Sequence, residues 1–337
     1  MSARALLESL AAGRDLGWQE AQSLMRFYMS GEAEDPWIAG TLVALRMKGA
    51  KGSELAAFAS VLRESALGLA RAHPAMVDTC GTGGGRPSFN LSTAAAIVAA
   101  AAGAKVAKHG NRAVTSNCGS ADVLEALGVV LVSDPEVLQH VFDSVGIVFL
   151  FAPHHHPAMR NVAAARKALG IRTVFNQLGP LANPAGANRQ LIGVWDAALI
   201  RPMAEALVAL ACERSMVVHG LDGLDEISPC GPTRFALVDG AEIREGVVEP
   251  DEFGIEPLEP SDLAPGDTLA ENAALLRRAL SEPDSPQARA VLPNAAAALH
   301  LAGFGSLSEA ADHAREAIRS GTAIRKLDEL IEVTRSL

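Results

Sequence analysis

The position that most constrains the fold is His73, because the hydrophobic periodicity of the chain changes there. Before it, apolar residues recur at the three- and four-residue spacing of amphipathic helices, as Leu24 and Tyr28 illustrate. After it, short apolar runs alternate with helical stretches, which is typical of βα units in a mostly parallel sheet. The sequence therefore predicts an α/β protein with a small all-helical domain, residues 1–72, and a large α/β domain with a central, mostly parallel sheet, residues 73–337.

The short apolar runs of the second part are expected to be strands. They cover residues 76–79, 104–107, 129–132, 147–151, 191–195, 216–218, 235–238 and 242–244. Asp239-Gly240 is a strong hairpin turn, so the last two runs should pair. Asp134 is a good N-cap for a helix that ends near residue 145, and the chain from about residue 269 onward is expected to be helical. In the N-terminal part, Pro36 is expected to open one helix and Ser53 to cap another.

Composition and charge exclude several classes of protein. Hydrophobic residues make up 49% of the chain and charged residues 20%, a balance that favours a globular fold over disorder. The formal net charge is −10, so the surface as a whole should repel nucleic acid and anionic membranes, and we expect neither as a partner. No signal-peptide pattern opens the sequence, and no apolar run approaches the ~20 residues of a transmembrane helix. We therefore expect a cytoplasmic protein. Because the four cysteines lie far apart without a CxxC pair, we also expect reduced thiols and no structural zinc.

The most informative stretch runs from Asp78 to Gly85 and is followed by hydroxyl and amide side chains and an alanine-rich helix. Glycines let the backbone approach a ligand, and a helix N-terminus presents N–H groups and a partial positive charge, so this stretch is suited to hold an anion. The spacing excludes a dinucleotide fingerprint, because Arg86 stands where the third glycine should be, and the lysine of a P-loop is missing. By itself the stretch is equally compatible with a turn that only joins a strand to a helix.

A second polar glycine loop follows one unit later, from Lys108 to Arg112, with Ser116 and Ser120 behind it. Its cations supply the local positive charge that an anionic ligand needs in an acidic chain. A solvated basic loop is the alternative. Two such loops at the carboxyl ends of neighbouring strands are better explained by one ligand in the crevice of an α/β sheet.

Several long motifs, in order along nearly the whole chain, resemble those of the anthranilate phosphoribosyltransferase family. They are Gly81-Thr82-Gly83-Gly84, Phe89-Asn90-Leu91-Ser92-Thr93, Lys108-His109-Gly110-Asn111-Arg112, and the segments 119–128, 156–160, 176–184 and 223–227. The resemblance implies a pentosyltransferase of tryptophan biosynthesis that transfers the phosphoribosyl group of phosphoribosyl pyrophosphate to anthranilate. It also implies that residues 161–183 complete the small helical domain and that the protein forms a homodimer through that domain.

The resemblance also assigns residues to three parts of a site. Phosphoribosyl pyrophosphate would be bound by Gly81, Gly84, Gly85, Ser88, Asn90, Leu91, Ser92, Thr93, Lys108, His109, Gly110, Asn111, Arg112, Ser116 and Ser120. Two magnesium ions per monomer would be held by Ser92, Asp225 and Glu226. Anthranilate would be bound by Gly81, Asn111, His156 and Arg166. No residue is assigned as a covalent or acid–base catalyst, because the amine nucleophile is already neutral and positioning and metal electrostatics should suffice.

The residue types by themselves support part of this assignment. Adjacent carboxylates at Asp225 and Glu226 suit a hard cation that bridges to phosphates, although without the glycine loop they would be taken for two exposed acids in a turn. The guanidinium of Arg166 can pair bidentately with a carboxylate, although most helix arginines are merely solvated. The three histidines at residues 154–156 are expected on an extended loop, where neighbouring side chains diverge, so they should not bind one zinc ion. Only His156 fits the family motif.

Two departures from the family motif limit the comparison. Gly85 stands where an aspartate is usual, and the loop from Gly81 to Asn90 is one residue shorter. The first departure removes a carboxylate near the metal and the pyrophosphate. Either Asp225 and Glu226 suffice to hold the metal, or the affinity for magnesium is weaker.

Two other functions are weighed against this one. A pyrimidine nucleoside phosphorylase would bind phosphate in the same crevice, but its lysine and serine motif after the glycine loop is not seen, and segment 223–227 favours the transferase. A catalytically inactive relative that binds nucleic acid is disfavoured by the net charge of −10.

Overall fold

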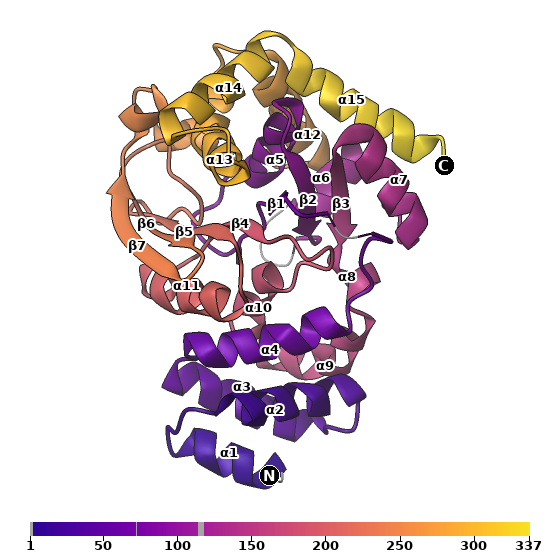
Figure 1. Cartoon of the computed structure of the whole chain (residues 1–337), viewed down its shortest axis with the longest axis vertical. Coiled ribbons are helices and arrows are strands. Elements are labelled where there is room, and N and C mark those ends of the chain that lie inside the picture. Colours follow the sequence, from indigo (N-terminus) through magenta and orange to yellow (C-terminus); the bar gives the residue numbers. More distant parts are fainter. Residues whose placement is uncertain (1–2, 72, 114–117) are drawn as a thin grey trace.

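The computed structural model describes residues 3–71, 73–113 and 118–337. Helices near the N-terminus form one end of the molecule, and a sheet covered by helices forms the rest (Figure 1). This arrangement confirms the predicted fold class, a small helical part joined to a larger α/β part with a mostly parallel sheet.

The N-terminal end consists of helices α1 (Ala3–Ala11), α2 (Trp18–Ser30), α3 (Asp35–Lys48) and α4 (Gly52–Glu64). Pro36 lies in the first turn of α3, as expected from its fixed φ and missing N–H. The expected cap at Ser53 is wrong, because α4 already begins at Gly52. The Glu54 carboxylate accepts the Lys51 backbone N–H at 2.8 Å and so takes over the capping function.

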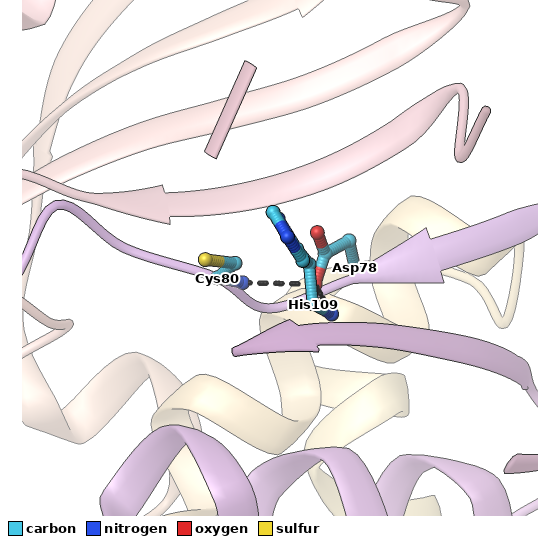
Figure 2. Close-up of side chains that lie close together, drawn as sticks. All are labelled: Asp78, Cys80 and His109. Carbon is cyan, nitrogen blue, oxygen red and sulfur yellow. Dashed lines mark hydrogen bonds between the residues drawn. The ribbon is translucent and has the colours of Figure 1, made fainter. Parts of the chain in front are cut away.

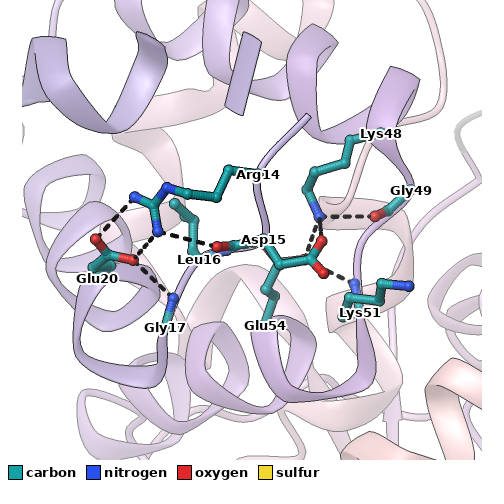
Figure 3. A network of polar contacts seen from close by, with 9 residues as sticks. All are labelled: Arg14, Asp15, Leu16, Gly17, Glu20, Lys48, Gly49, Lys51 and Glu54. Carbon is teal, nitrogen blue, oxygen red and sulfur yellow. Dashed lines mark hydrogen bonds and ion pairs between the residues drawn. The ribbon is translucent and has the colours of Figure 1, made fainter. Parts of the chain in front are cut away.

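A buried ion pair connects the ends of neighbouring helices (Figure 3). The side chain of Glu54 is 0% exposed and that of Lys48 is 5% exposed, and their charged atoms lie 2.7 Å apart. Glu54 also accepts the Leu16 backbone N–H at 2.8 Å, and Lys48 Nζ reaches Asp15 at 2.7 Å. The link between α1 and α2 is therefore fastened to the end of α3 and the start of α4.

The sheet contains strands β1 (Met76–Asp78), β2 (Lys105–Gly110), β3 (Ile147–Phe151), β4 (Arg189–Gly193), β5 (Arg214–Gly220), β6 (Thr233–Asp239) and β7 (Glu242–Val248). The strand order is β3-β2-β1-β4-β5-β6-β7. The pairs from β3 to β5 are parallel, and β6 is antiparallel to both of its neighbours. The predicted hairpin at Asp239-Gly240 is confirmed, since Asp239 pairs with Glu242 across the turn.

The expected strand at residues 129–132 is wrong. The Val129 backbone N–H bonds to the Leu124 carbonyl of the preceding helix, and the Val130 N–H bonds to Thr334 Oγ1 near the C-terminus. Val129 is buried in the hydrophobic core but lies in a loop rather than in a strand, and Val130 is 46% exposed. A short apolar run cannot by itself distinguish these two environments.

The remaining helices are α5 (Leu91–Ala101), α6 (Ser120–Leu127), α7 (Pro135–Val145), α8 (Ala152–His155), α9 (Arg160–Leu169), α10 (Phe175–Leu181), α11 (Ile200–Ala209), α12 (Leu269–Ser281), α13 (Pro286–Ala302), α14 (Leu307–Arg319) and α15 (Thr322–Arg335). Short 3-10 helices lie at Pro157–Met159, Ala197–Leu199, Pro250–Phe253 and Pro260–Leu263. The predicted helix after Asp134 is confirmed, with the Asp134 side chain accepting the N–H groups of Glu136 and Val137. Alanines at residues 94–96 and 295–298 are fully buried, so α5 and α13 pack closely.

None of the described helices is, taken singly, long and apolar enough to cross a membrane. Helices α13 and α14 meet the criterion only as a pair, with a bend of 116° between them.

One hydrophobic cluster runs from the N-terminal helices into the face of the sheet. It contains Leu24 and Phe58 from α2 and α4, Phe175 from α10, and Ile192 and Val217 from β4 and β5. Helix α11 lies between α4 and the sheet and contacts both (Figure 1). The core of the helical end therefore includes side chains from much later in the chain.

The sheet order places a topological switch point at β1. From β1 the chain moves outward to β2 and β3, and then returns to β4 on the opposite side of β1. At such a point the connections after two neighbouring parallel strands leave in opposite directions and open a crevice at their carboxyl ends. The loops after β1, β2, β4 and β5 begin at this edge.

Candidate active site

The glycine loop after β1 runs against the carboxyl end of β4. The Thr82 backbone N–H donates to the Gly193 carbonyl oxygen at 2.8 Å. A Cβ atom on Gly81 would lie 2.9 Å from that oxygen, and a Cβ on Gly193 would lie 1.7 Å from the Asp225 carbonyl oxygen. Glycine is therefore required where the loop, the strand and the acidic segment touch. These contacts bring the loop beside Asp225 and Glu226.

The absence of a side chain at residue 85 has a steric cause. A Cβ on Gly85 would lie 2.5 Å from both the backbone nitrogen and Oδ1 of Asp225. The Gly85 N–H instead lies beside the Asp225 carboxylate and lowers its pKa, and the next N–H, of Arg86, donates to the Gly223 carbonyl at 2.7 Å. In this shortened loop an aspartate at position 85 would have to displace Asp225.

Lys108, near the end of β2, brings a positive charge into the crevice. It is 3% exposed, and its Nζ donates to the carbonyl and hydroxyl oxygens of Thr79 at 3.3 and 3.1 Å and to Ser92 Oγ at 3.3 Å. These acceptors are all neutral. The charge of Lys108 also lowers the pKa values of the nearby Asp78 and Glu226, which compensate part of this buried charge, and an anionic ligand in the crevice would compensate it further.

The two acids of the segment after β5 face the same region. The backbone N–H and the hydroxyl group of Ser92 lie near Glu226 and lower the pKa of its carboxyl group. Burial, and after it the negative charge of Asp225, raise the pKa of Glu226 to about 8. Burial also raises the pKa of Asp225. Desolvation and mutual repulsion of two carboxylates are both relieved when a cation binds, so the pair suits a hard metal ion.

The start of α5 contains buried polar side-chain atoms that lack hydrogen-bond partners among the described residues. Asn90 occupies the N-cap position but does not cap the helix with its side chain, which donates instead to the Cys118 carbonyl at 3.1 Å. Among the residues that the structure describes, the side-chain oxygens of Asn90 and Thr93 are buried and have no hydrogen-bond partner. Such oxygens are rare in folded proteins, and together with the N–H groups of a first helical turn they indicate a ligand site.

His109 and His156 lie side by side, with ring centroids 5.4 Å apart. His109 Nδ1 pairs with the Gly179 carbonyl at 3.2 Å, and His156 Nε2 pairs with the Ala182 carbonyl at 2.9 Å. Burial lowers the pKa of His109 to about 3 and that of His156 to about 4, so both rings are neutral near pH 7. Their other nitrogens are buried and have no partner within the described part of the chain, and each must be a hydrogen-bond acceptor because the first nitrogen carries the proton. His109, assigned by resemblance to the sugar phosphate, thus packs against a residue assigned to the acceptor.

Arg166 lies on α9, with its guanidinium carbon 5.1 Å from the ring centroid of Phe175. Burial lowers the pKa of Arg166. An arginine held on an aromatic face keeps its planar edge available for a carboxylate. Its geometry is therefore compatible with binding an aromatic acid.

The turn after β2 holds further predicted residues. The Asn111 carbonyl accepts the Ser120 hydroxyl at 3.2 Å, and a Cβ on Gly110 would lie 2.3 Å from Ser120 Oγ. Arg112 is exposed, and its guanidinium pairs with Asp122 at 3.0 Å and with Glu125 at 2.5 Å. Two carboxylates of α6 therefore already neutralise the charge of Arg112.

Two further predicted residues lie at the start of α5 or just before it. Leu91 is the first residue of α5 and is buried, and Ser88 is partly buried in the loop before it. Ser116 lies outside the described residues.

The three neighbouring histidines have separate partners. They lie on the short helix α8 and just after it rather than on the expected extended loop. His154 packs edge-on against Phe151, His155 Nδ1 pairs with the Leu67 carbonyl, and His156 pairs with Ala182. Their side chains diverge because each is committed to a different part of the chain.

Asp78, Cys80 and His109 form a compact group, with one ligand atom from each lying within 4.8 Å of the others (Figure 2). Asp78 is fully buried and accepts hydrogen bonds from the N–H groups of Cys80 and His109, both at 3.1 Å, and from Asn183 Nδ2 at 2.7 Å. Burial raises the pKa of the Cys80 thiol to about 12, so it stays protonated. The carboxylate is therefore occupied in tying the ends of β1 and β2 to the segment after α10.

Three residues near the site were not predicted from the sequence. Asn183 connects β1 and β2 to the segment after α10, and Arg172 and Trp195 lie beside the glycine loop. Asn183 Nδ2 also donates to the Ala107 carbonyl at 2.8 Å. Arg172 donates to the Gly84 carbonyl at 2.5 Å and lies over the ring of Trp195. Nothing local distinguishes Arg172 from other exposed arginines, because its partners lie on loops far from it in the sequence.

Two family models match the chain and together cover most of it. Residues 4–66 match the helical bundle domain of the glycosyl transferase family, and residues 73–324 match its α/β domain. The fold and the crevice therefore define a glycosyl transferase built from these two domains.

Known proteins of one kind resemble the chain along its whole length. An anthranilate phosphoribosyltransferase from Desulfatibacillum aliphaticivorans is 47% identical, over 98% of both chains. The crystal structure of anthranilate phosphoribosyltransferase from Thermus thermophilus has a TM-score of 0.91 and 44% identity, and covers 98% of this chain and 99% of that one. The Saccharomyces cerevisiae enzyme, solved in complex with PRPP and Mg, has a TM-score of 0.88 and 30% identity over 99% and 98% of the two chains. The chain belongs to the anthranilate phosphoribosyltransferase family, which confirms the resemblance and the predicted class of enzyme, a pentosyltransferase.

Proposed function

We propose that the chain transfers the phosphoribosyl group of phosphoribosyl pyrophosphate to anthranilate, which gives N-(5-phosphoribosyl)anthranilate and pyrophosphate, the second step of tryptophan biosynthesis from chorismate. The observation that carries the proposal is the convergence of the glycine loop, Lys108 and the adjacent acids Asp225 and Glu226 at the carboxyl edge of the sheet. A cradle for phosphate, a buried cation and a carboxylate pair are together what a pyrophosphorylated sugar with a bound metal requires.

Phosphoribosyl pyrophosphate is proposed to bind at the glycine loop and the start of α5. The unpaired oxygens of Asn90 and Thr93 would meet hydroxyl groups of the sugar, and the N–H groups of the first helical turn would meet phosphate oxygens. Lys108 would compensate the charge of the pyrophosphate. Arg112 is the least supported of the predicted residues, because it already pairs with Asp122 and Glu125.

Magnesium fits the donor set of this chain. Ser92, Asp225 and Glu226 offer hydroxyl and carboxylate oxygens, which are the ligands that magnesium prefers, and a bound cation would relieve the burial and the repulsion from Asp225 that raise the pKa of Glu226. We propose that these residues hold two ions per monomer. When bound, magnesium neutralises charge on the departing pyrophosphate.

Anthranilate is proposed to bind between Gly81, Asn111, His156 and Arg166. Arg166 would pair with its carboxylate, and the unpaired nitrogens of His109 and His156 would accept hydrogen bonds from its amine. Neutral imidazoles suit this task, because the aromatic amine is itself neutral near pH 7 and has to keep its lone pair for attack. The thiol of Cys80, with its raised pKa, is not needed as a nucleophile.

The division of the chain and its assembly are also proposed. The small domain would comprise residues 1–72 with about residues 161–183, whose side chains share its core, and residues 73–337 would form the large domain. A homodimer through the small domain would cover large apolar side chains such as Met47, which is 83% exposed. The four free cysteines suit a reducing compartment such as the cytoplasm.

The direct test is to mix the protein with phosphoribosyl pyrophosphate, magnesium and anthranilate and to follow the loss of anthranilate fluorescence. Replacing both Asp225 and Glu226 with alanine is expected to abolish magnesium-dependent turnover, because the proposed metal site loses both carboxylates. Asp284→Ala, which removes an exposed carboxylate between α12 and α13, serves as the control. Full activity of the double variant would dismiss the two acids as metal ligands.

A further inference from the structure

The peptide group between Gly84 and Gly85 lies between a cation and a carboxylate. The Gly84 carbonyl oxygen accepts a hydrogen bond from Arg172 Nη2 at 2.5 Å. Gly85, on the opposite side of the same planar group, lies directly against Asp225, since a Cβ on Gly85 would be 2.5 Å from Oδ1, and the Gly85 N–H lowers the pKa of that carboxylate. One peptide unit therefore connects the guanidinium group of Arg172 to the carboxylate group of Asp225.

Both residues that flank this peptide group have to be glycine. Gly84 has a φ of +90°, and a Cβ there would lie 2.8 Å from Arg172 Nη2. A Cβ on Gly85 would lie 2.5 Å from Oδ1 of Asp225. The loop is thus closely packed between Arg172 and Asp225, and only a chain without side chains at these two positions can pass between them.

Arg172 is itself held at two points. Its guanidinium carbon lies 5.1 Å from the ring centroid of Trp195, which follows β4. Its backbone carbonyl accepts a hydrogen bond from Arg46 Nη1 of α3 at 2.6 Å. The stacking and the backbone contact fix the direction of the side chain, although Arg172 is exposed.

We propose that Arg172 is a positioning residue that orients Asp225 through the Gly84–Gly85 peptide group and so sets the geometry of the cation site. The inference rests on the proposed function, in which Asp225 holds magnesium. A charge-assisted hydrogen bond to a carbonyl polarises the peptide group, so the Arg172 bond to Gly84 strengthens the attraction between the Gly85 N–H and the adjacent Asp225 carboxylate. Without Arg172, the Gly84 carbonyl loses its partner, and both the loop and Asp225 gain freedom to move.

A direct contact between Arg172 and a substrate phosphate is the competing explanation. The engagement of the guanidinium group with the Gly84 carbonyl and the Trp195 ring favours the positioning role. The two explanations differ in one measurable respect. A positioning residue that acts through Asp225 loses its influence when Asp225 is altered, whereas a phosphate ligand keeps it.

The test is a double-mutant cycle between Arg172→Ala and Asp225→Asn. For each enzyme, kcat and both Michaelis constants are measured over a series of magnesium concentrations. Arg172→Ala is expected to raise the half-saturating magnesium concentration and the KM for phosphoribosyl pyrophosphate by about tenfold, the effect of losing one charge-assisted hydrogen bond. The KM for anthranilate should stay within about twofold, since the acceptor is proposed to bind at Arg166. In the Asp225→Asn background, Arg172→Ala should add little.

Two further variants complete the design. Lys167→Ala removes an exposed cation from the last turn of α9 and should leave every constant unchanged. Arg172→Lys keeps the charge and one donor, and should recover part of the magnesium affinity. If Asp225→Asn is too slow to assay, binding of Mn²⁺ in the presence of pyrophosphate, followed by electron paramagnetic resonance, gives the same cycle without turnover.

The outcomes separate the inference from the proposed function. Unchanged magnesium dependence in Arg172→Ala overturns the inference, and so does an effect that is fully additive with Asp225→Asn. If Arg172→Ala does not fold, Arg172→Lys and Trp195→Leu are measured in the same cycle against the same criteria. A wild-type protein that does not consume anthranilate contradicts the proposed function, while the Mn²⁺ cycle still tests whether Arg172 acts on Asp225.

Discussion

Arg166 is the residue on which binding of the acceptor should depend most. Its guanidinium group is partly buried against Phe175, and the desolvation that lowers its pKa makes an anionic partner more favourable. Arg166→Ala is therefore expected to raise the KM for anthranilate by about 10- to 100-fold, the effect of losing a charged hydrogen-bonding partner, with a smaller change in the KM for phosphoribosyl pyrophosphate. Steady-state kinetics with each substrate varied in turn measures both constants. An unchanged KM for anthranilate would remove Arg166 from the acceptor site.

His156 should make the stability of the protein sensitive to acid. Burial lowers its pKa to about 4 in the folded state, below the ~6.5 of an unfolded histidine. The unfolded chain therefore takes up a proton first as the pH falls. The contribution of His156 to the free energy of unfolding is complete above about pH 6.5 and is lost as the pH falls toward 4.

His156→Gln tests this dependence, because its amide nitrogen can still donate to the Ala182 carbonyl. Between pH 7 and pH 5 the wild-type protein should lose about 2 kcal/mol more unfolding free energy than the variant. Urea unfolding at both pH values measures the difference. Identical losses in the two proteins would show that His156 is not the group responsible.

At the scale of elements, the ion pair between Lys48 and Glu54 should contribute strongly to the free energy of unfolding, although it lies in the small helical part. Glu54 is fully buried and accepts two backbone N–H groups as well as the lysine. Lys48→Met leaves its carboxylate without a counter-ion and should lower the free energy of unfolding by about 3 kcal/mol. The double variant Lys48→Met/Glu54→Gln should be less destabilised than Lys48→Met, because no buried charge remains.

Chemical denaturation compares these proteins, with Lys51→Met as a control that removes an exposed lysine beside the same helix. Equal destabilisation by Lys48→Met and Lys51→Met would mean that the pair contributes nothing specific.

Element positions could largely be read from the sequence where a local signal exists. Asp134 and Asp239-Gly240 marked a helix start and a hairpin, because capping and turn geometry depend on a few neighbouring residues. The run at 129–132 was misread, and Ser53 was wrongly expected to cap α4. In both cases the deciding partner is another side chain, Thr334 for the first and Glu54 for the second.

At the scale of the whole molecule, the core of the helical end depends on later parts of the chain. Phe175, Ile192 and Val217 pack in the same cluster as the buried residues of α2 and α4. A peptide of residues 1–72 alone would expose the apolar surfaces that these side chains cover, and is expected to unfold without a cooperative transition. Circular dichroism during thermal unfolding measures this, with the intact chain as the control. A sharp transition in the isolated peptide would contradict the shared core.

The candidate site is likewise a property of the whole sheet. The chain returns from β3 to β4 across β1, and this reversal alone brings the glycine loop beside the acids that follow β5. The family motifs supplied most of the residues proposed for the candidate site, since each motif is a continuous stretch of sequence. They did not name Arg172, because its role arises from contacts with Gly84 and Trp195 on other loops.

The sequence by itself determined the two-part α/β fold, the family and the stretches that form the crevice, because periodicity, turn chemistry and continuous motifs are local properties of a chain. Only the tertiary structure decided why Gly85 carries no side chain, which buried polar atoms of the described residues have no hydrogen-bond partner, and how Arg172 meets the glycine loop. The physical reason is that sterics, desolvation and hydrogen bonding act over a few ångströms in space, between residues that the sequence places far apart.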